Sequence, residues 1–427
     1  MSTVTSAPRL ALFGGTPVRD TRTHPWPRWP QGTDADVAAV GEVIRGGRWN
    51  RWNGDQVVAL ESKLQGFSGA RRAVAVSSGT AALEVALKAA GVRPGDEVIV
   101  PAFTFVATAT AALQVGAVPV FADVLLETQN LDPASFEAQI TERTRAVIPV
   151  HTTGLPCDMD AILAIARRHG LVVIEDACQA IGGVWNGRRA GTIGDAGCYS
   201  FQASKTLPSG EGGALVTDND VLADKAFGRM HIGRKPGGEF YTHYILGWNY
   251  RLTEMQAALL LSQFERFPET QRRRVANAAF VRDELARIPG IIPVREDTYV
   301  TEHGLYGYLF RFLSERFAPG LGLSRATLLQ ALQAEGIPCR VFYDHPLYQN
   351  PLFLEAHEAM KDDCPFACRH PAAQAADYRQ VSLPNTERLC TAESLYFPQS
   401  VLLGSRRDMQ DIVDAFAKLQ ANAAQLH

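Results

Sequence analysis

Short apolar runs recur between residues 36 and 265, and stretches with helical spacing separate them. The runs are Val74–Val76, Glu97–Val100, Val118–Phe121, Ala146–Val150, Val172–Ile174 and Ala214–Val216. Strands that alternate with helices form a mainly parallel sheet whose faces the helices cover. The sequence therefore predicts an α/β fold, in which a ligand binds outside the carboxyl ends of the strands.

Over its whole length, the sequence predicts three regions. Residues 1–35 are rich in Pro, Arg and Trp and should form an arm on the surface or on a partner subunit. Residues 36–265 should form the large domain. Residues 266–427 should form a smaller α+β domain with linking helices, a helix break at Pro268, a strand around 308–312 and a final amphipathic helix over 409–419.

Composition excludes some partners. The formal net charge of -3 gives no electrostatic case for nucleic acid or an anionic membrane. The first eight residues have neither a charged region nor an apolar core, so we expect no secretory signal. The uncharged stretch from Val98 to Ala122 is long enough to span a bilayer, but Pro101, Gly116 and Pro119 interrupt it, so we predict core and no membrane span.

The chain has 7 scattered cysteines, which predict reduced thiols in a cytoplasmic protein. Cys364, Cys368 and His370 form the one group that invites a metal interpretation. Because no second cluster would complete a tetrahedral site, we predict no metal.

One lysine lies between a strand end with a hydroxyl group and a glycine-rich turn. Ser200 is followed by Lys205 and then by Gly210–Gly213, and the strand before them runs into Glu175 and Asp176. Pyridoxal 5'-phosphate (PLP) needs an amine for its aldehyde, a carboxylate for its pyridine nitrogen, and hydroxyls and N–H donors for its phosphate. The segment predicts a PLP site, although a surface lysine is the alternative for Lys205.

A phosphate cradle is predicted upstream. The strand Ala73–Val76 runs into Ser77-Ser78-Gly79-Thr80 and then into a helix over 81–90. The first helical N–H groups lack internal partners and the helix dipole favours an anion there. Gly79 would let the backbone approach the phosphate, and Thr80 would add a hydroxyl. An ordinary helix N-cap is the alternative.

Six motifs in one order resemble the DegT/DnrJ/StrS family of PLP-dependent sugar and cyclitol aminotransferases, which have the fold type I of the aspartate aminotransferase superfamily. They are Ser78–Thr80, Pro101–Phe105, Glu175–Gln179, Ser200–Phe201 with Lys205, Gly210–Gly213 and Gly247–Arg251. The resemblance runs from about Trp26 to the C-terminus.

The resemblance implies roles for single residues. Lys205 would bind the cofactor and move the proton, and Asp176 would hold the pyridine nitrogen protonated. Gln179 would lie near the ring, and Ser200 would bind the phosphate. Residue 175 should point the opposite way from Asp176 if the strand continues. The alternatives are a helix N-cap for Asp176 and a strand-end hydroxyl for Ser200.

Three further roles follow from the resemblance. Phe105 would stack on the ring, with Phe103 as its rival and core packing expected for at least one of them. Asn249 would reach the phosphate of the neighbouring subunit, which implies a homodimer with shared sites; a turn asparagine is the alternative. The segment 231–244, which precedes Asn249, would lie on the loop presented to the partner's active site, where the candidate substrate residues are His231, Arg234 and Tyr241, although Arg234 could equally be a solvent-exposed arginine.

The expected function is transfer of an amino group from L-glutamate or L-glutamine to a keto-cyclitol or keto-sugar, in aminoglycoside-like or aminohydroxybenzoate-type secondary metabolism. Amination of nucleotide-linked keto-sugars is the main alternative. The segment His151-Thr152-Thr153-Gly154 disfavours it, because the sugar aminotransferases commonly carry a tyrosine before the glycine. A dehydratase dependent on pyridoxamine 5'-phosphate (PMP), in which histidine replaces the lysine, and a non-catalytic regulator are further alternatives, which Lys205 disfavours.

Overall fold

The computed structural model describes residues 9–355 and 377–426. Its centre is a seven-stranded sheet of order β1-β9-β8-β5-β4-β2-β3. The strands are β1 (Arg72–Val76), β2 (Glu97–Pro101), β3 (Val118–Ala122), β4 (Thr144–Val147), β5 (Val172–Asp176), β8 (Ala196–Ser200) and β9 (Gly213–Thr217). Each pair of neighbouring strands in the part β8-β5-β4-β2-β3 is parallel, whereas β9 is antiparallel to both of its neighbours, β1 and β8. The predicted α/β class with a mainly parallel sheet is confirmed.

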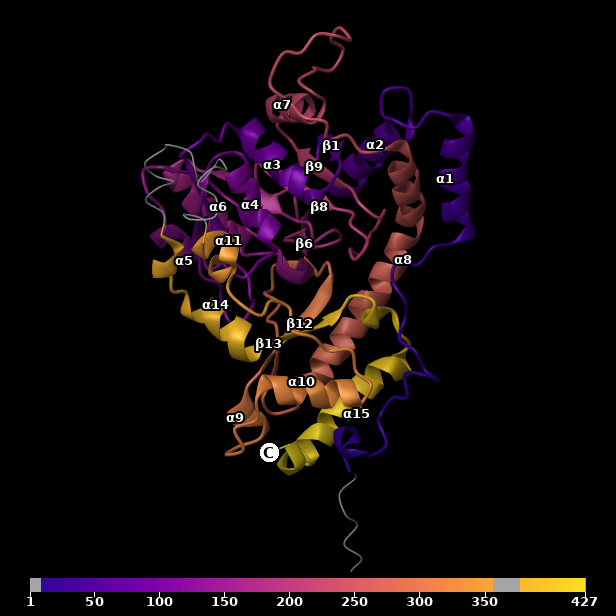
Figure 1. The fold of residues 1–427 in the computed structure, drawn as a ribbon, viewed down its shortest axis with the longest axis vertical. Helices are drawn as coiled ribbons and strands as arrows, with labels where there is room; N and C mark the ends of the chain where they lie inside the picture. Colours follow the sequence, from indigo (N-terminus) through magenta and orange to yellow (C-terminus); the bar gives the residue numbers. More distant parts are fainter. Residues whose placement is uncertain (1–8, 356–376, 427) are drawn as a thin grey trace, which may run out of the picture.

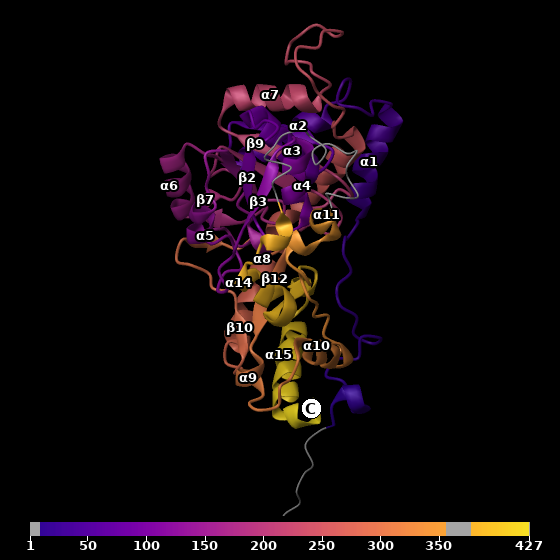
Figure 2. The ribbon, with the colours of Figure 1, turned by 60° about the vertical axis from the view of Figure 1, so that its left-hand side comes forward.

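Helices cover both faces of the sheet, as Figures 1 and 2 show. One face packs on α3 (Gly79–Ala90), α4 (Val106–Gln114) and α7 (Asp220–Met230); the other packs on α2 (Gln56–Ser68), α6 (Met159–His169) and α8 (Glu254–Leu285). Side chains alternate between these faces: Ile174 of β5 packs on the face covered by α3, α4 and α7, and Val173 packs on the opposite face. The next two residues of β5 continue this alternation.

The long helix α8 joins the two halves of the molecule (Figure 1). The helix break predicted at Pro268 is wrong, because α8 continues through it to Leu285. Phe264 and Phe267 before the proline and Gln271 after it are all buried, so tertiary packing outweighs the roughly 3 kcal/mol that an interior proline costs. The predicted domain boundary at residue 265 falls inside this helix and stays a prediction.

A second core lies at the other end of α8. Its antiparallel sheet comprises β10 (Ile291–Pro293), β12 (Gly307–Phe312) and β13 (Ser394–Pro398), and it packs against α10 (Arg325–Ala334) and α15 (Arg406–Ala421). The predicted strand over 308–312 and the predicted final helix are confirmed. Leu347, Phe353 and Tyr378 return to the core of the large sheet, so the C-terminal third serves both halves.

The described part of the N-terminal arm packs on its own chain (Figure 1). Leu10 is buried in the second core, and Arg19 forms ion pairs with Asp408 and Asp411 of α15 at 2.6 and 2.7 Å. The indole Nε1 of Trp26 donates to the Gly336 carbonyl at 2.8 Å. The arm then leads into α1 (Asp34–Gly46), which lies along α8.

Three predictions concern membrane spans, cysteines and metal. Among the described residues, no helix is long and apolar enough to cross a membrane. The described cysteines, Cys157, Cys178, Cys198, Cys339 and Cys390, are free thiols. Cys364, Cys368 and His370, the group that invited a metal interpretation, lie outside the described residues.

Candidate active site

A cavity of about 500 Å³ lies where β5 and β8 end and where α3 and α4 begin. Of the predicted site residues, its wall contains Gly79, Thr80, Phe105, Asp176, Gln179, Ser200 and Lys205. The structure thus brings together, from four separate motifs, the groups that the sequence predicts to hold a cofactor.

The first turn of α3 forms one end of the cavity. Ser78 is the N-cap, and its hydroxyl accepts from Ala81 N at 3.1 Å. A Cβ atom on Gly79 would lie 2.7 Å from Cys178 Sγ and 2.8 Å from Ser200 Cβ. Only glycine therefore lets α3 begin this close to the ends of β5 and β8. The first N–H groups of the helix have no intrahelical acceptor, which makes this end of the cavity suited to an anion.

Asp176 places a buried carboxylate in the cavity wall, with 5% of the residue exposed. Thr108 of α4 donates its hydroxyl to Oδ2 at 2.8 Å, and Cys178 N donates to Oδ1 at 3.2 Å. Both bonds are accepted by carboxylate oxygens and fix the orientation of the side chain. The sequence did not point to Thr108, because a threonine inside a helix carries no recognisable signal. Burial and the Asp176 charge together raise the pKa of the Cys178 thiol, so it stays protonated.

Gln179 links β5 to the C-terminal half of the chain. Its Oε1 accepts from Thr153 N at 2.8 Å, and its Nε2 donates to the Tyr343 hydroxyl at 3.3 Å. Thr153 adopts a left-handed backbone conformation, with φ of 50°. Burial raises the pKa of Tyr343, which therefore keeps its proton.

Lys205 lies in the connection between β8 and β9. Its Nζ is 4.1 Å from the centre of the Tyr306 ring, a cation–π contact. The Tyr306 hydroxyl is 2.9 Å from the Ser204 hydroxyl. Tyr306, Phe342, Tyr343 and Tyr396 all line the cavity from the C-terminal half. Sequence reasoning missed these aromatic residues because no motif marks them and their partners are distant in the chain.

The two candidate ring-stacking residues occupy different environments. Phe105, the N-cap of α4, lines the cavity and is 58% exposed. Phe103 is fully buried and its ring centre is 5.0 Å from that of Tyr343. This geometry fits core packing for Phe103 and leaves Phe105 free to meet a ligand.

The remaining predicted residues lie outside this cavity, on the loop that follows α7 and projects from the molecule in Figures 1 and 2. Asn249 is exposed and pairs with His231 in an isolated β-bridge. The Arg234 guanidinium carbon is 4.3 Å from the centre of the Phe240 ring, and Tyr241 is 84% exposed. Within one chain these residues do not meet Lys205.

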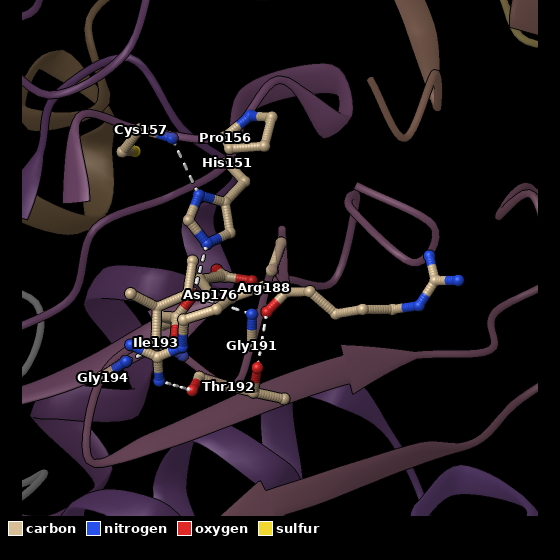
Figure 3. Close-up of polar contacts among 12 residues, drawn as sticks. His151, Pro156, Cys157, Asp176, Arg188, Gly191, Thr192, Ile193 and Gly194 are labelled. Atoms are coloured by element: carbon tan, nitrogen blue, oxygen red, sulfur yellow. Dashed lines mark hydrogen bonds and ion pairs between the residues drawn. The ribbon is translucent and has the colours of Figure 1, made fainter. Parts of the chain in front are cut away.

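A buried polar cluster stands behind Asp176. The carboxylate of Glu175 accepts from Gly191 N at 2.7 Å, from Ile193 N at 2.5 Å and from Gly194 N at 2.6 Å. His151 Nε2 lies 2.8 Å from it, and Cys157 N donates to His151 Nδ1 at 3.0 Å. Figure 3 shows Cys157 and the loop 191–194 on opposite sides of the His151 ring. Because Nδ1 accepts a hydrogen bond from the Cys157 N–H, Nε2 carries a ring proton and donates a hydrogen bond to the Glu175 carboxylate.

Comparison with known proteins places this site in a family. The model of the DegT/DnrJ/EryC1/StrS aminotransferase family matches residues 30–400. The chain belongs to this family. The resemblance inferred from the six motifs is confirmed, and the chain is an aminotransferase.

Similar proteins include one relative with a curated name and two solved structures. L-glutamine:2-deoxy-scyllo-inosose aminotransferase from Streptomyces kanamyceticus is 37% identical over 442 residues, covering 98% of this chain and 98% of that protein. The crystal structure of 3-amino-5-hydroxybenzoic acid synthase has a TM-score of 0.81 and 33% identity, and covers 93% of this chain and 99% of that one. The structure of ntda from Bacillus subtilis with bound cofactor PMP has a TM-score of 0.76 and 26% identity. The match covers 91% of this chain and 82% of that one. The fold is the fold type I of these aminotransferases.

Proposed function

We propose that this aminotransferase uses PLP to move an amino group from L-glutamine, or from L-glutamate, to the ketone of a cyclitol. The observation that supports the proposal most strongly is that Lys205, Asp176 and the start of α3 share one cavity. The relative from Streptomyces kanamyceticus is named for glutamine and an inosose. The biosynthesis of aminoglycoside-like metabolites is the corresponding setting.

The residues present fit PLP. A cavity of about 500 Å³ is large enough for a cofactor with a small substrate. Ser78, Gly79, Thr80 and Ser200 would hold the phosphate, and Phe105 would cover the ring. When bound, PLP supplies an electron-withdrawing ring and an aldehyde carbon that carries the amino group.

Each protein group then has one task. The Asp176 carboxylate, oriented by Thr108, holds a proton on the pyridine nitrogen. The Lys205 amine would bind the cofactor and would move a proton at the substrate carbon. The ring of Tyr306 keeps the Lys205 amine inside the cavity. Gln179, fixed by Thr153 and Tyr343, would lie beside the pyridine ring of the cofactor.

The charges that a single chain contributes to the wall favour a neutral, hydroxylated ketone over a nucleotide-linked sugar. Apart from tyrosine and cysteine, the ionisable residues of the wall are Asp176, Glu211 and Lys205. The described wall contains no arginine. A nucleotide diphosphate needs cations, whereas the hydroxyls of Tyr306, Tyr343 and Tyr396 suit the hydroxyls of a cyclitol. Thr153 occupies the position before Gly154, where the sugar aminotransferases commonly carry a tyrosine.

The site is proposed to be completed by a second copy of the chain. Asn249 and the candidate substrate residues lie on the projecting loop, outside the cavity of their own chain. This region also exposes large apolar side chains: Trp52 is 52% exposed and Leu246 is 71% exposed. Both observations support a homodimer in which the loop reaches the partner's cavity. The cytoplasmic location stays a prediction.

The deciding experiment uses the protein in its PMP form. A single turnover is followed by absorbance with 2-deoxy-scyllo-inosose, with scyllo-inosose and with a nucleotide-linked 4-keto sugar. We expect a cyclitol ketone to react at least about tenfold faster than the nucleotide sugar. Faster reaction of the nucleotide sugar would establish the alternative acceptor. No reaction with either class would refute the proposed acceptor chemistry.

A further inference from the structure

The backbone of the Lys205 turn is held by a residue from the far N-terminal arm. The indole Nε1 of Trp29 donates to the carbonyl oxygen of Lys205 at 3.0 Å. Lys205 N donates to the Gln202 carbonyl at 2.8 Å within the turn. Both backbone groups of Lys205 are therefore satisfied, one of them from outside the large sheet.

A second contact holds the carbonyl of the preceding residue. Gln399 Nε2 donates to the Ser204 carbonyl at 3.5 Å, a long bond. Gln399 is itself oriented by Arg274 of α8, whose Nε donates to Gln399 Oε1 at 2.9 Å. Two adjacent carbonyls of the turn are thus reached from two separate elements.

Arg274 connects these two contacts. It is fully buried, its guanidinium carbon is 5.1 Å from the centre of the Trp29 ring, and its Nη2 has no hydrogen-bond partner among the described residues. Burial lowers the pKa of Arg274 to about 9. A buried guanidinium is costly to keep in a fold, so its place between Trp29 and Gln399 calls for a function.

The side chain of Lys205 is fixed at its other end by Tyr306. Its Nζ lies over the Tyr306 ring, and the Tyr306 hydroxyl meets Ser204. The direction of a lysine side chain depends on the backbone angles of its residue. Holding the Ser204 and Lys205 carbonyls therefore determines where the amine enters the cavity.

We propose that Trp29 is a positioning residue for Lys205, and that Gln399, oriented by Arg274, is a second. The arm then aims the amine at the cofactor, which is a role beyond packing on the C-terminal half. This inference rests on the proposed function of Lys205.

The matched test compares Trp29→Phe with Trp26→Phe. Both remove an indole N–H on the same arm, but Trp26 donates to Gly336, away from the site. In cofactor-free protein, the rate at which acetic anhydride modifies Lys205 is measured by peptide mass spectrometry between pH 7 and pH 10. Lys63 and Lys225 serve as internal references.

We expect Trp29→Phe to raise the modification rate of Lys205 about threefold or more, because the amine leaves the Tyr306 ring. A change of this size corresponds to the net free energy of about one hydrogen bond. Gln399→Met should shift the rate in the same direction by less. Trp26→Phe should leave it unchanged. An unchanged rate in Trp29→Phe, or an equal rise in Trp26→Phe, would overturn the proposal.

A second measurement separates this inference from the proposed function. Added PLP is followed by the absorbance change as it becomes attached to Lys205. Attachment should be several-fold slower in Trp29→Phe than in Trp26→Phe. If PLP does not attach to Lys205 in the unmodified protein, the proposed function fails, and the modification rates still decide whether Trp29 positions the lysine.

Discussion

Glu175 and Asp176 are adjacent in β5, yet their carboxylates lie on opposite faces of the sheet. Asp176 lines the cavity and accepts from Thr108. Glu175 is fully buried behind it and accepts from the loop 191–194 and from His151. The alternation of side chains along a strand separates them, so one acid can serve the chemistry while the other holds the strand end in place.

The first prediction concerns the charge of Asp176. Asp176→Asn keeps the shape but removes the charge that would hold the pyridine nitrogen protonated. We expect PLP still to bind while the half-reaction with L-glutamine slows about 10³-fold, or roughly 4 kcal/mol of transition-state stabilisation. Single-turnover absorbance measures this rate. A rate near that of the unmodified protein would show that Asp176 does not face the pyridine nitrogen.

The second prediction concerns the stability that Glu175 provides. In Glu175→Gln one carboxylate oxygen becomes an NH₂ group, which faces N–H donors whichever way the amide turns. We expect the free energy of unfolding to fall by about 2–4 kcal/mol, with little change in the rate of the half-reaction. Urea denaturation tests this against Glu265→Gln, a control whose side chain is 72% exposed. Equal stability of the two variants would contradict the role of the buried cluster.

The sequence predicted the parts of the site that depend on local chemistry. Gly79 at a helix start, Asp176 at a strand end and Lys205 before a glycine turn can each be read from neighbouring residues. Tyr306, Thr108 and Trp29 could not, because their contacts with residues 205 and 176 depend on packing between distant segments. Pro268 shows the same limit in the fold, since its local preference for a break loses to the burial of Phe264 and Phe267.

The third prediction concerns the residue that binds the cofactor. The purified protein should be yellow, and borohydride should fix the cofactor irreversibly on Lys205, because this is the lysine in the cavity wall. Peptide mapping of the reduced protein locates the label. Lys205→Ala should remain unlabelled, whereas Lys88→Ala, outside the wall, should label normally. A label on another lysine would refute the assignment.

The fourth prediction concerns shared sites in a homodimer. If Asn249 reaches the partner's cofactor, Lys205→Ala chains and Asn249→Asp chains should each be inactive as pure dimers. Mixed dimers should recover activity, because one of their two sites then has both groups intact. Tagged heterodimers are purified and assayed for this. Verified heterodimers without activity would indicate that each site belongs to one chain.

The last prediction concerns acid sensitivity at His231. Burial, followed by the charges of Arg251, Arg234 and Arg51, lowers the pKa of His231 to about 4. The unfolded chain, with a histidine pKa near 6.5, therefore binds more protons between these two values. The resulting stability is complete above about pH 6.5 and is lost as the pH falls toward 4.

His231→Asn keeps a polar side chain without this titration. We expect its free energy of unfolding to decline less than that of the unmodified protein between pH 6.5 and pH 4.5, by on the order of 1–2 kcal/mol. Urea denaturation at a fixed protein concentration measures both curves, since dimerisation would otherwise shift them. His24→Asn, at an exposed position, is the control and should follow the unmodified protein. Parallel curves for His231→Asn and His24→Asn would show that burial and the surrounding arginines do not hold His231 neutral, because the folded protein must lose stability when a buried neutral histidine gains a proton.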